Sequence, residues 1–126
     1  MPARIVVVHD DPDFVETVRT SLQLENYDVI AFTDTLAALK ALEAARLTDI
    51  LITGTRFPAG TPNGVSLALM ARYKRPNVKI LVAAAPEHQE HADGIGEILP
   101  YPVDIPYLLT IVRGLIGNGC LLPKVS

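Results

Sequence analysis

The sequence predicts an α/β domain built on a five-stranded parallel sheet with helices on both faces. Short apolar runs alternate along the chain with longer segments of helical period. The first predicted strand, Arg4–His9, contains a continuous Ile/Val run, as strands buried on both faces do. Parallel strands need crossover connections, and the helical segments supply them.

The first helix is expected directly after Asp11-Pro12, because proline suits the first turn of a helix. Its apolar side chains share one stripe, as in a helix that buries a single face: Phe14, Val15, Val18 and Leu22. Asp11 can cap this helix, where a carboxylate gains from the helix dipole.

A second strand is predicted over Tyr27–Phe32, and a helix over Leu36–Arg46 follows it. Asp34 stands in front of that helix, at a position where it can cap the first turn. Three leucines of the helix are expected to face inward among alanines: Leu36, Leu39 and Leu42.

The third and fourth strands are expected at Ile50–Thr53 and Val78–Ala84. An amphipathic helix over Gly64–Tyr73 lies between them, after a loop rich in glycine and proline. A short polar segment, Glu87–Asp93, is also typical of a helix. A weaker fifth strand at Glu97–Leu99 completes the sheet.

The last helix, Ile105–Ile116, is expected to end at Gly117-Asn118-Gly119, since glycine commonly follows a helix end. We therefore predict one domain over residues 1–119. Residues 120–126 are predicted to be a C-terminal tail or the start of a linker. The single cysteine, Cys120, excludes an internal disulfide and has no basic neighbour that would suggest a reactive thiol.

The composition is that of a globular protein: 126 residues, 49% apolar and 20% charged. The net charge is −3 and no run of lysine or arginine occurs, which argues against binding of nucleic acid or of an anionic membrane. No apolar run is long enough for a signal peptide or a membrane span. We expect a cytoplasmic location.

Ligand sites of doubly wound sheets lie at the carboxyl ends of the strands, where the strand order reverses. In this chain that rule selects four segments: His9–Asp11, Thr53–Thr55, Ala83–Ala85 and Leu99–Tyr101. A glycine-rich turn after the first strand would indicate a dinucleotide site, but this chain has His-Asp-Asp-Pro there.

Two of these segments carry a family resemblance. The first strand followed by His9-Asp10-Asp11-Pro12, and the third strand running into Gly54-Thr55-Arg56-Phe57-Pro58, resemble the receiver domain of two-component response regulators. The resemblance covers Arg4 to Ile116 and implies a flavodoxin-like (βα)5 fold. In that family, acids at the ends of strands one and three hold Mg²⁺, and an aspartate ending strand three accepts a phosphoryl group.

Measured against that pattern, the chain lacks the phosphoacceptor, because Gly54 takes its position. Ala84 replaces the hydroxyl residue of strand four, and Tyr101 replaces the lysine before the proline. His9 replaces one acid, while Asp10 matches the direct metal ligand. A shift of one residue would instead place Asp10 and Asp11 on the acidic pair.

The resemblance therefore implies a pocket remnant of His9, Asp10 and Asp11 with no catalytic residue, and we expect no enzyme and no cofactor. Asp10 and Asp11 are the candidate ligands for Mg²⁺, and binding is expected to be weak. The hydroxyl of Tyr101 is expected to bond Asp10 or His9, and the Tyr101–Pro102 peptide bond to be cis. Strand alternation is expected to turn Thr53 and Thr55 away from the pocket.

This reading predicts a signalling module that works by protein–protein interaction and independently of phosphorylation. The resemblance implies protein partners, either a histidine kinase or an output domain, and a homodimer through the same surface. That surface would comprise the fourth helix, fifth strand and fifth helix, with six candidate contact residues: His88, His91, Ile98, Tyr101, Tyr107 and Leu108.

Two alternatives stay open. A working receiver would need a substitute phosphoacceptor, for which Asp10 and Asp11 are the candidates. A small metal- or ligand-binding protein would use His9, Asp10, His88 and His91. The spacing of His88 and His91 places them on one helical face beside Glu87, although a solvated helix explains it as well.

Overall fold

The computed structural model describes residues 3–44, 48–55, 63–87 and 94–121. It contains one five-stranded sheet in the order β2-β1-β3-β4-β5, and every neighbouring pair is parallel. The predicted parallel α/β sheet is therefore confirmed. Its strands are β1 (Arg4–Val8), β2 (Asp28–Phe32), β3 (Ile50–Thr53), β4 (Lys79–Ala84) and β5 (Glu97–Pro100).

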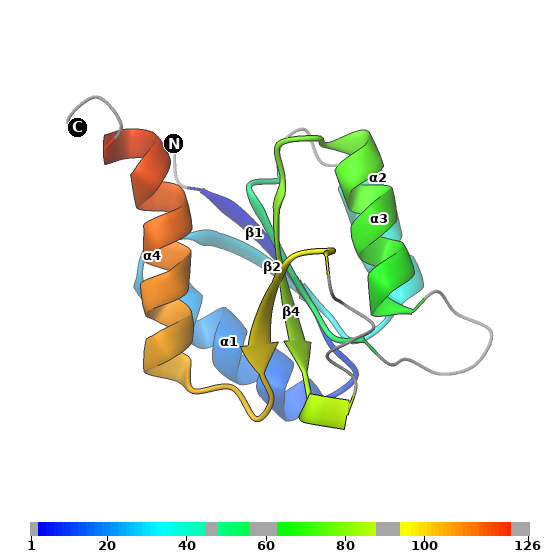
Figure 1. Cartoon of the computed structure of the whole chain (residues 1–126), viewed down its shortest axis with the longest axis horizontal. Helices are drawn as coiled ribbons and strands as arrows, with labels where there is room; N and C mark the ends of the chain where they lie inside the picture. The colour runs from blue at the N-terminus through cyan, green and yellow to red at the C-terminus, as the bar shows by residue number, and fades with distance from the viewer. Residues whose placement is uncertain (1–2, 45–47, 56–62, 88–93, 122–126) are drawn as a thin grey trace.

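Helices cover both faces of the sheet. Figure 1 shows α1 and α4 on one side of the strands and α2 and α3 on the other. The helix predicted within Glu87–Asp93 falls almost wholly outside the described residues. No helix in the described ranges is both long and apolar enough to cross a membrane. The bounds are α1 (Pro12–Leu24), α2 (Thr35–Ala44), α3 (Gly64–Lys74) and α4 (Ile105–Leu121).

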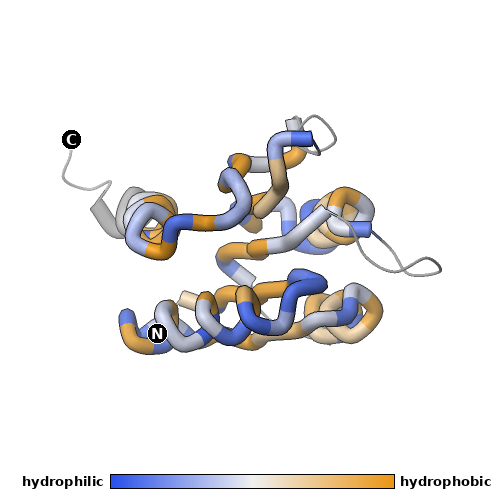
Figure 2. The backbone as a smooth tube through the Cα atoms, turned by 90° about the horizontal axis from the view of Figure 1, so that it is seen from below, coloured by the Kyte–Doolittle hydropathy of each residue, from blue (hydrophilic) through white to orange (hydrophobic). Residues whose placement is uncertain are grey.

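Two apolar layers hold the helices to the sheet. Successive strand residues point to opposite faces. In β1, Ile5 and Val7 pack toward α1 and α4, whereas Val6 and Val8 pack toward α2 and α3. Along the helices in Figure 2, hydrophobic colouring alternates with hydrophilic, as expected where one side is buried. The continuous apolar run of β1 is thus explained by burial on both faces.

Side chains cap three of the helices, and two of these caps were predicted from the local sequence. The Asp11 carboxylate accepts hydrogen bonds from the backbone N–H groups of Asp13 and Phe14, at 3.0 and 3.4 Å. Asp34 accepts from the N–H of Leu36 at 3.1 Å, and Asn63 caps α3. The caps predicted at Asp11 and Asp34 are confirmed, and each satisfies N–H groups that the helix itself leaves unpaired.

Two local predictions are wrong. Leu36 is 45% exposed, because the buried stripe of α2 runs through Thr35, Ala38 and Leu42. The last helix does not end at Gly117-Asn118-Gly119 but continues to Leu121. Glycine in a helix costs only about 1 kcal/mol relative to alanine and, unlike proline, does not block helix geometry.

The start of α3 lies directly against the end of β3. A Cβ atom added to Gly64 would come within 1.5 Å of the carbonyl oxygen of Gly54. The N–H group of Gly64 donates to the carbonyl of Thr55 at 3.1 Å. Only a residue without a side chain permits this approach, so Gly64 sets how closely α3 packs on the strand end.

We predict that Gly64→Ala lowers the free energy of unfolding by at least about 3 kcal/mol, because either α3 or the β3 backbone must move. Gly114→Ala is the matched control: it lies within α4 with nothing within 4 Å of the added Cβ. That control should stabilise the domain by up to about 1 kcal/mol. Urea unfolding of both variants tests this, and equal effects would contradict it.

Candidate functional site

The carboxyl ends of the strands form a small cavity at the edge that the sequence predicts. The strand order reverses around β1 and β3, so the residues after these two strands meet there. The cavity has a volume of about 180 Å³. The described residues that line it are His9, Asp10, Thr55, Ala83, Ala85, Glu87 and Tyr101.

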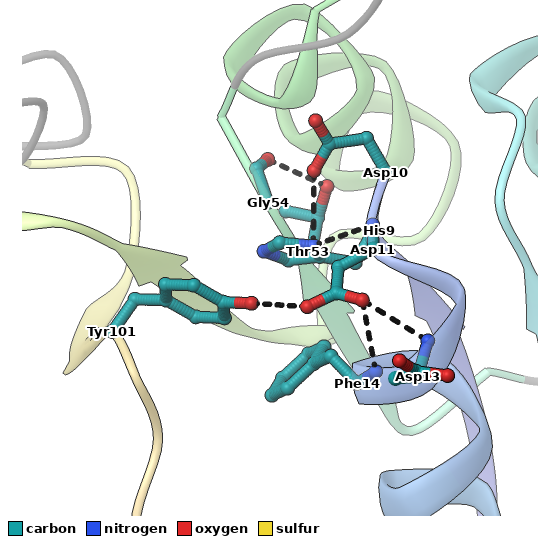
Figure 3. Close-up of polar contacts among 8 residues, drawn as sticks. All are labelled: His9, Asp10, Asp11, Asp13, Phe14, Thr53, Gly54 and Tyr101. Carbon is teal, nitrogen blue, oxygen red and sulfur yellow. Dashed lines mark hydrogen bonds and ion pairs between the residues drawn. The ribbon is translucent and has the colours of Figure 1, made fainter.

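The imidazole of His9 is the buried centre of this edge, with only 7% of the residue exposed. It stacks on the ring of Tyr101, with centroids 5.0 Å apart and an interplanar angle of 19°. The Phe14 ring tilts against it at 4.6 Å, and Phe14 also meets Tyr101 edge-on. Figure 3 shows these three rings together: His9 and Tyr101 directly follow β1 and β5, and Phe14 belongs to α1.

One nitrogen of His9 has two polar neighbours. Its Nδ1 accepts a hydrogen bond from the N–H group of Asp11 at 3.2 Å. The same atom lies 3.1 Å from Oδ1 of Asp10. Burial lowers the pKa of His9 below its ordinary value of 6.5, and this effect outweighs the opposing influence of the Asp10 and Asp11 carboxylates. His9 is therefore neutral at pH 7.

Gly54 lies directly under this ring. A Cβ atom added to Gly54 would come within 2.7 Å of His9 Cδ2 and 3.0 Å of Nε2. Real Cβ atoms essentially never make contacts this short, so the imidazole occupies the space that a side chain at position 54 would need. Sequence reasoning found the two unusual residues separately, but not that one excludes a side chain on the other.

Asp11 is held by both of its carboxylate oxygens. Oδ1 caps α1, and Oδ2 accepts a hydrogen bond from the Tyr101 hydroxyl at 2.5 Å. This bond lowers the pKa of Asp11 and raises the pKa of Tyr101 to about 12. The expected partner of the tyrosine hydroxyl, Asp10 or His9, was wrong: His9 meets Tyr101 by ring stacking, which leaves the hydroxyl directed at Asp11 (Figure 3).

The site does not fit Mg²⁺. The ion needs several oxygen ligands in near-octahedral geometry. Asp11 already uses both oxygens within the protein, and Gly54 supplies no side-chain ligand. Asp10 is the one carboxylate of the predicted pair that stays available. Across the described ranges, no three His, Cys, Asp or Glu side chains gather closely enough to hold a metal.

The two threonines behave differently. Thr53 is buried and its hydroxyl donates to the carbonyl of Gly54 at 2.9 Å, as expected for a side chain turned away from the cavity. Thr55 was expected to point away too, yet it lines the cavity. It lies beyond the last residue of β3, where strand alternation no longer holds. At the end of β4, Ala84 is buried against the α2–α3 layer, and Ala83 and Ala85 line the cavity instead.

The predicted interaction surface is found only in part. Tyr107 is 44% exposed and Ile98 is partly buried. Leu108 was predicted to lie on this surface, which is wrong: it is fully buried. Leu108 and Val112 form the stripe of α4 that packs on the sheet, one turn apart. His88 and His91 lie outside the described residues. The predicted cis bond between Tyr101 and Pro102 is present.

The strand order and the helices on both faces define a doubly wound, flavodoxin-like domain. No family model matches the chain. Solved structures nevertheless share the fold over nearly its whole length. A response regulator receiver domain protein from Methanospirillum hungatei is 21% identical with a TM-score of 0.81, and the match covers 94% of this chain and 98% of that one.

Two further solved structures share this fold at similarly low sequence identity. A response regulator receiver protein from Sinorhizobium medicae is 23% identical, with a TM-score of 0.80 over 92% of this chain and 95% of that one. A structure described as adenylate cyclase from Rhodopirellula baltica is 19% identical, with a TM-score of 0.82 over 99% and 100%. At these identities the likeness establishes a receiver-type fold, and the chemistry has to be argued from the site.

We predict that Gly54→Ala lowers the free energy of unfolding by about 1–3 kcal/mol, the usual cost of overpacking. The cost arises because the new Cβ collides with a ring that cannot leave its place between Phe14 and Tyr101. In a His9→Ala background the same change should cost much less. A double-mutant cycle in urea measures the coupling, and additive effects would contradict the contact.

Stability should also depend on pH through His9. The unfolded chain takes up a proton near pH 6.5, whereas the folded chain resists it, so stability falls as the pH drops below that value. His9→Phe keeps an aromatic ring and removes the titration, which should flatten the curve between about pH 5 and 7. Protonation of Asp11, whose pKa is lowered in the folded chain, reduces stability only at more acidic pH. Parallel curves for both proteins would refute this assignment.

Millimolar Mg²⁺ should leave the melting temperature unchanged, because an ion that binds the folded state must raise it. The control is the double variant His9→Asp with Gly54→Asp, which restores acids at both positions and removes the ring that excludes a side chain at position 54. We expect Mg²⁺ to stabilise this variant. A clear rise for the native chain would show that the site binds the ion after all.

Proposed function

We propose that this domain is a receiver-like signalling module of a two-component or phosphorelay-type system, and that it acts through protein contacts without phosphotransfer. One observation carries the proposal. The position at the end of β3 where a receiver has its phosphoacceptor is Gly54, and the His9 ring fills the space above it. Neither a nucleophile nor room for one exists at that position.

The surroundings of Gly54 support the same conclusion. An acyl phosphate would need cationic or hydrogen-bonding groups for its oxygens. Tyr101 stands where the lysine is expected, and its hydroxyl is already bonded to Asp11. Among the described residues that line the cavity, none is lysine or arginine. A phosphoryl group would therefore meet carboxylates without a compensating positive charge.

The two alternatives receive less support. As a substitute acceptor, Asp11 would have to give up both its helix cap and its bond to Tyr101 before it could attack. The Asp10 side chain is 52% exposed and lies against His9, but none of the described residues that line the cavity is a lysine or arginine that could stabilise the transferred phosphoryl group. A metal-binding role would depend on His88 and His91, which lie outside the described residues.

For the partner, we favour a histidine kinase or an output domain that binds the surface formed by β5, α4 and the segment before β5. Tyr107 and Ile98 are the described candidates on that surface, and a homodimer through it is a further form of the proposal. Leu108 is excluded because it is buried in the core. Binding of the partner would then determine the signalling state of the module, since the domain carries no phosphoryl group that could do so.

Intact mass after incubation with acetyl phosphate and Mg²⁺ tests the proposal. The native chain should gain no phosphoryl group. Gly54→Asp alone is a poor positive control, because the new side chain collides with His9. The double variant His9→Asp with Gly54→Asp removes that collision and gives the reaction its acceptor.

Phosphate on the double variant alone would support the proposal and show that the fold can still carry the chemistry. Stoichiometric phosphate on the native chain would overturn it. In that case the variants Asp10→Asn and Asp11→Asn, tested separately, identify the acceptor by which of them abolishes the added mass. Asp13→Asn, which changes a neighbouring carboxylate outside the cavity, is the matched control.

A further inference from the structure

The solvent-facing side of α3 carries two large apolar side chains. Leu69 is 48% exposed and Tyr73 is 88% exposed. Residues four positions apart in a helix lie one above the other on the same face. Other residues form the side of α3 that is buried in the domain: Leu67, Ala68 and Ala71. The helix is therefore apolar on two sides, although burial in the domain requires only one.

This pair of exposed side chains is unusual within the domain. Large apolar side chains are exposed at five described positions, and α3 is the one described helix that carries two of them. Tyr73 is the most exposed of the five. Single exposed hydrophobic residues are normal, whereas contiguous ones mark interaction sites. Arg72 lies next to this pair, and tyrosine and arginine are the residue types that contribute most to protein interfaces.

Positive charge gathers at the same end of α3. No aspartate or glutamate occurs between positions 50 and 86, and four of the chain's eleven basic residues fall within positions 72–79. These four are Arg72, Lys74, Arg75 and Lys79. Other residues separate most of them, so the sequence contains no uninterrupted basic run. In a chain with a net charge of −3, the end of α3 is a local exception.

The contacts of these basic residues hold them in place without removing their charge. The guanidinium of Arg72 donates to the carbonyl oxygen of Ile95, which is an uncharged partner. Lys74 pairs with Glu43 of α2 at 3.7 Å, but the two side chains are 36% and 51% exposed, and such pairs are weak. Lys79 is exposed and forms no ion pair with a described residue. The end of α3 therefore attracts negatively charged groups.

We propose that the exposed side of α3 binds an acidic amphipathic helix of a protein partner. We define the α3 patch as Leu69, Arg72 and Tyr73, which lie three and four positions apart on one helical face. Apolar side chains of the partner pack on Leu69 and Tyr73, because helices pack through ridges of residues four positions apart. Carboxylates beside them lie against Arg72 and the neighbouring lysines, where charge-assisted hydrogen bonds form.

The distribution of charge favours a protein partner over a nucleic acid or a membrane. Binding of nucleic acid depends on many phosphate contacts, whereas this chain has a net charge of −3 and carries Asp10 and Glu87 at its cavity. The α3 patch also lies on the opposite face of the sheet from α4 (Figure 1). The proposal thus goes beyond the proposed function: a domain with two separate surfaces can connect two proteins.

The test is an NMR titration of the native chain, without any phosphoryl donor, with an amphipathic peptide of about three helical turns. One side of the peptide carries leucine and phenylalanine, and the other carries glutamate. We expect saturable shifts at the amides of Leu69, Arg72 and Tyr73. Tyr73→Ser should weaken binding at least about fivefold, as the loss of an interface hot spot does. Tyr107→Ser removes an exposed tyrosine from α4 and is the matched control, which should leave binding unchanged.

The contribution of charge is tested separately. Arg72→Gln removes the positive charge but keeps N–H donors for the carbonyl of Ile95, and it should weaken binding at least about threefold. Arg19→Gln removes the same charge from α1, on the other face of the sheet, and should have no effect. A peptide with lysine in place of glutamate should bind at least about tenfold more weakly. Because Tyr73 is almost fully exposed, its variant should keep the native amide spectrum.

The proposal is overturned if the acidic peptide gives no saturable shifts at the α3 patch, or if Tyr73→Ser and Tyr107→Ser behave alike. Equal binding of the lysine peptide would also overturn it. Tighter binding of polyuridylate or of phosphatidylglycerol vesicles would do the same, because the partner would then be a nucleic acid or a membrane. None of these variants changes Gly54 or a cavity residue, so the failure of the α3 patch is distinguished from the failure of the proposed function, which acetyl phosphate tests.

Discussion

At the carboxyl edge of the sheet, the buried imidazole of His9 lies against the backbone of Gly54, within the space of a missing side chain. The packing of the neighbouring residues at this edge depends on that contact. The ring needs a glycine beneath it, and the backbone carbonyl of that glycine lies so close to the start of α3 that position 64 must also be a glycine. Above the ring, Phe14 and Tyr101 close the cluster from α1 and the end of β5. Interior packing of this density leaves no room for a carboxylate at position 54.

The same substitutions change the electrostatics of the edge. Carboxylates that lie close together without a metal repel one another and raise a pKa or cost stability. Here one position has lost its side chain, and another carries a histidine that burial keeps neutral. The remaining acid at the helix start, Asp11, is stabilised as an anion by the Tyr101 hydroxyl and two backbone N–H groups. The edge thus holds together without a divalent ion, through hydrogen bonds and ring stacking.

This arrangement supports our proposal that the domain has a receiver-type scaffold and uses it for binding. A doubly wound sheet supports many activities, and the residues at its strand ends decide which one applies. In this chain those residues have become a compact aromatic cluster beside a small acidic cavity. Among the described residues that line this cavity, none is a lysine or arginine that could hold a phosphoryl group, and this supports the proposed role in binding without phosphotransfer.

The sequence by itself determined the sheet, its parallel strands and the helix starts at Asp11 and Asp34, because apolar periodicity and capping act over a few residues. It also identified His9, Gly54 and Tyr101 as unusual. Only the tertiary structure decided how they meet: the Tyr101 hydroxyl reaches Asp11 across 90 positions, and the His9 ring lies over Gly54. It also decided that Leu36 is exposed and Leu108 buried. The exposure of these two leucines depends on how each helix is rotated about its axis where it packs on the sheet. The apolar periodicity of the sequence predicts that rotation only to within part of a helical turn.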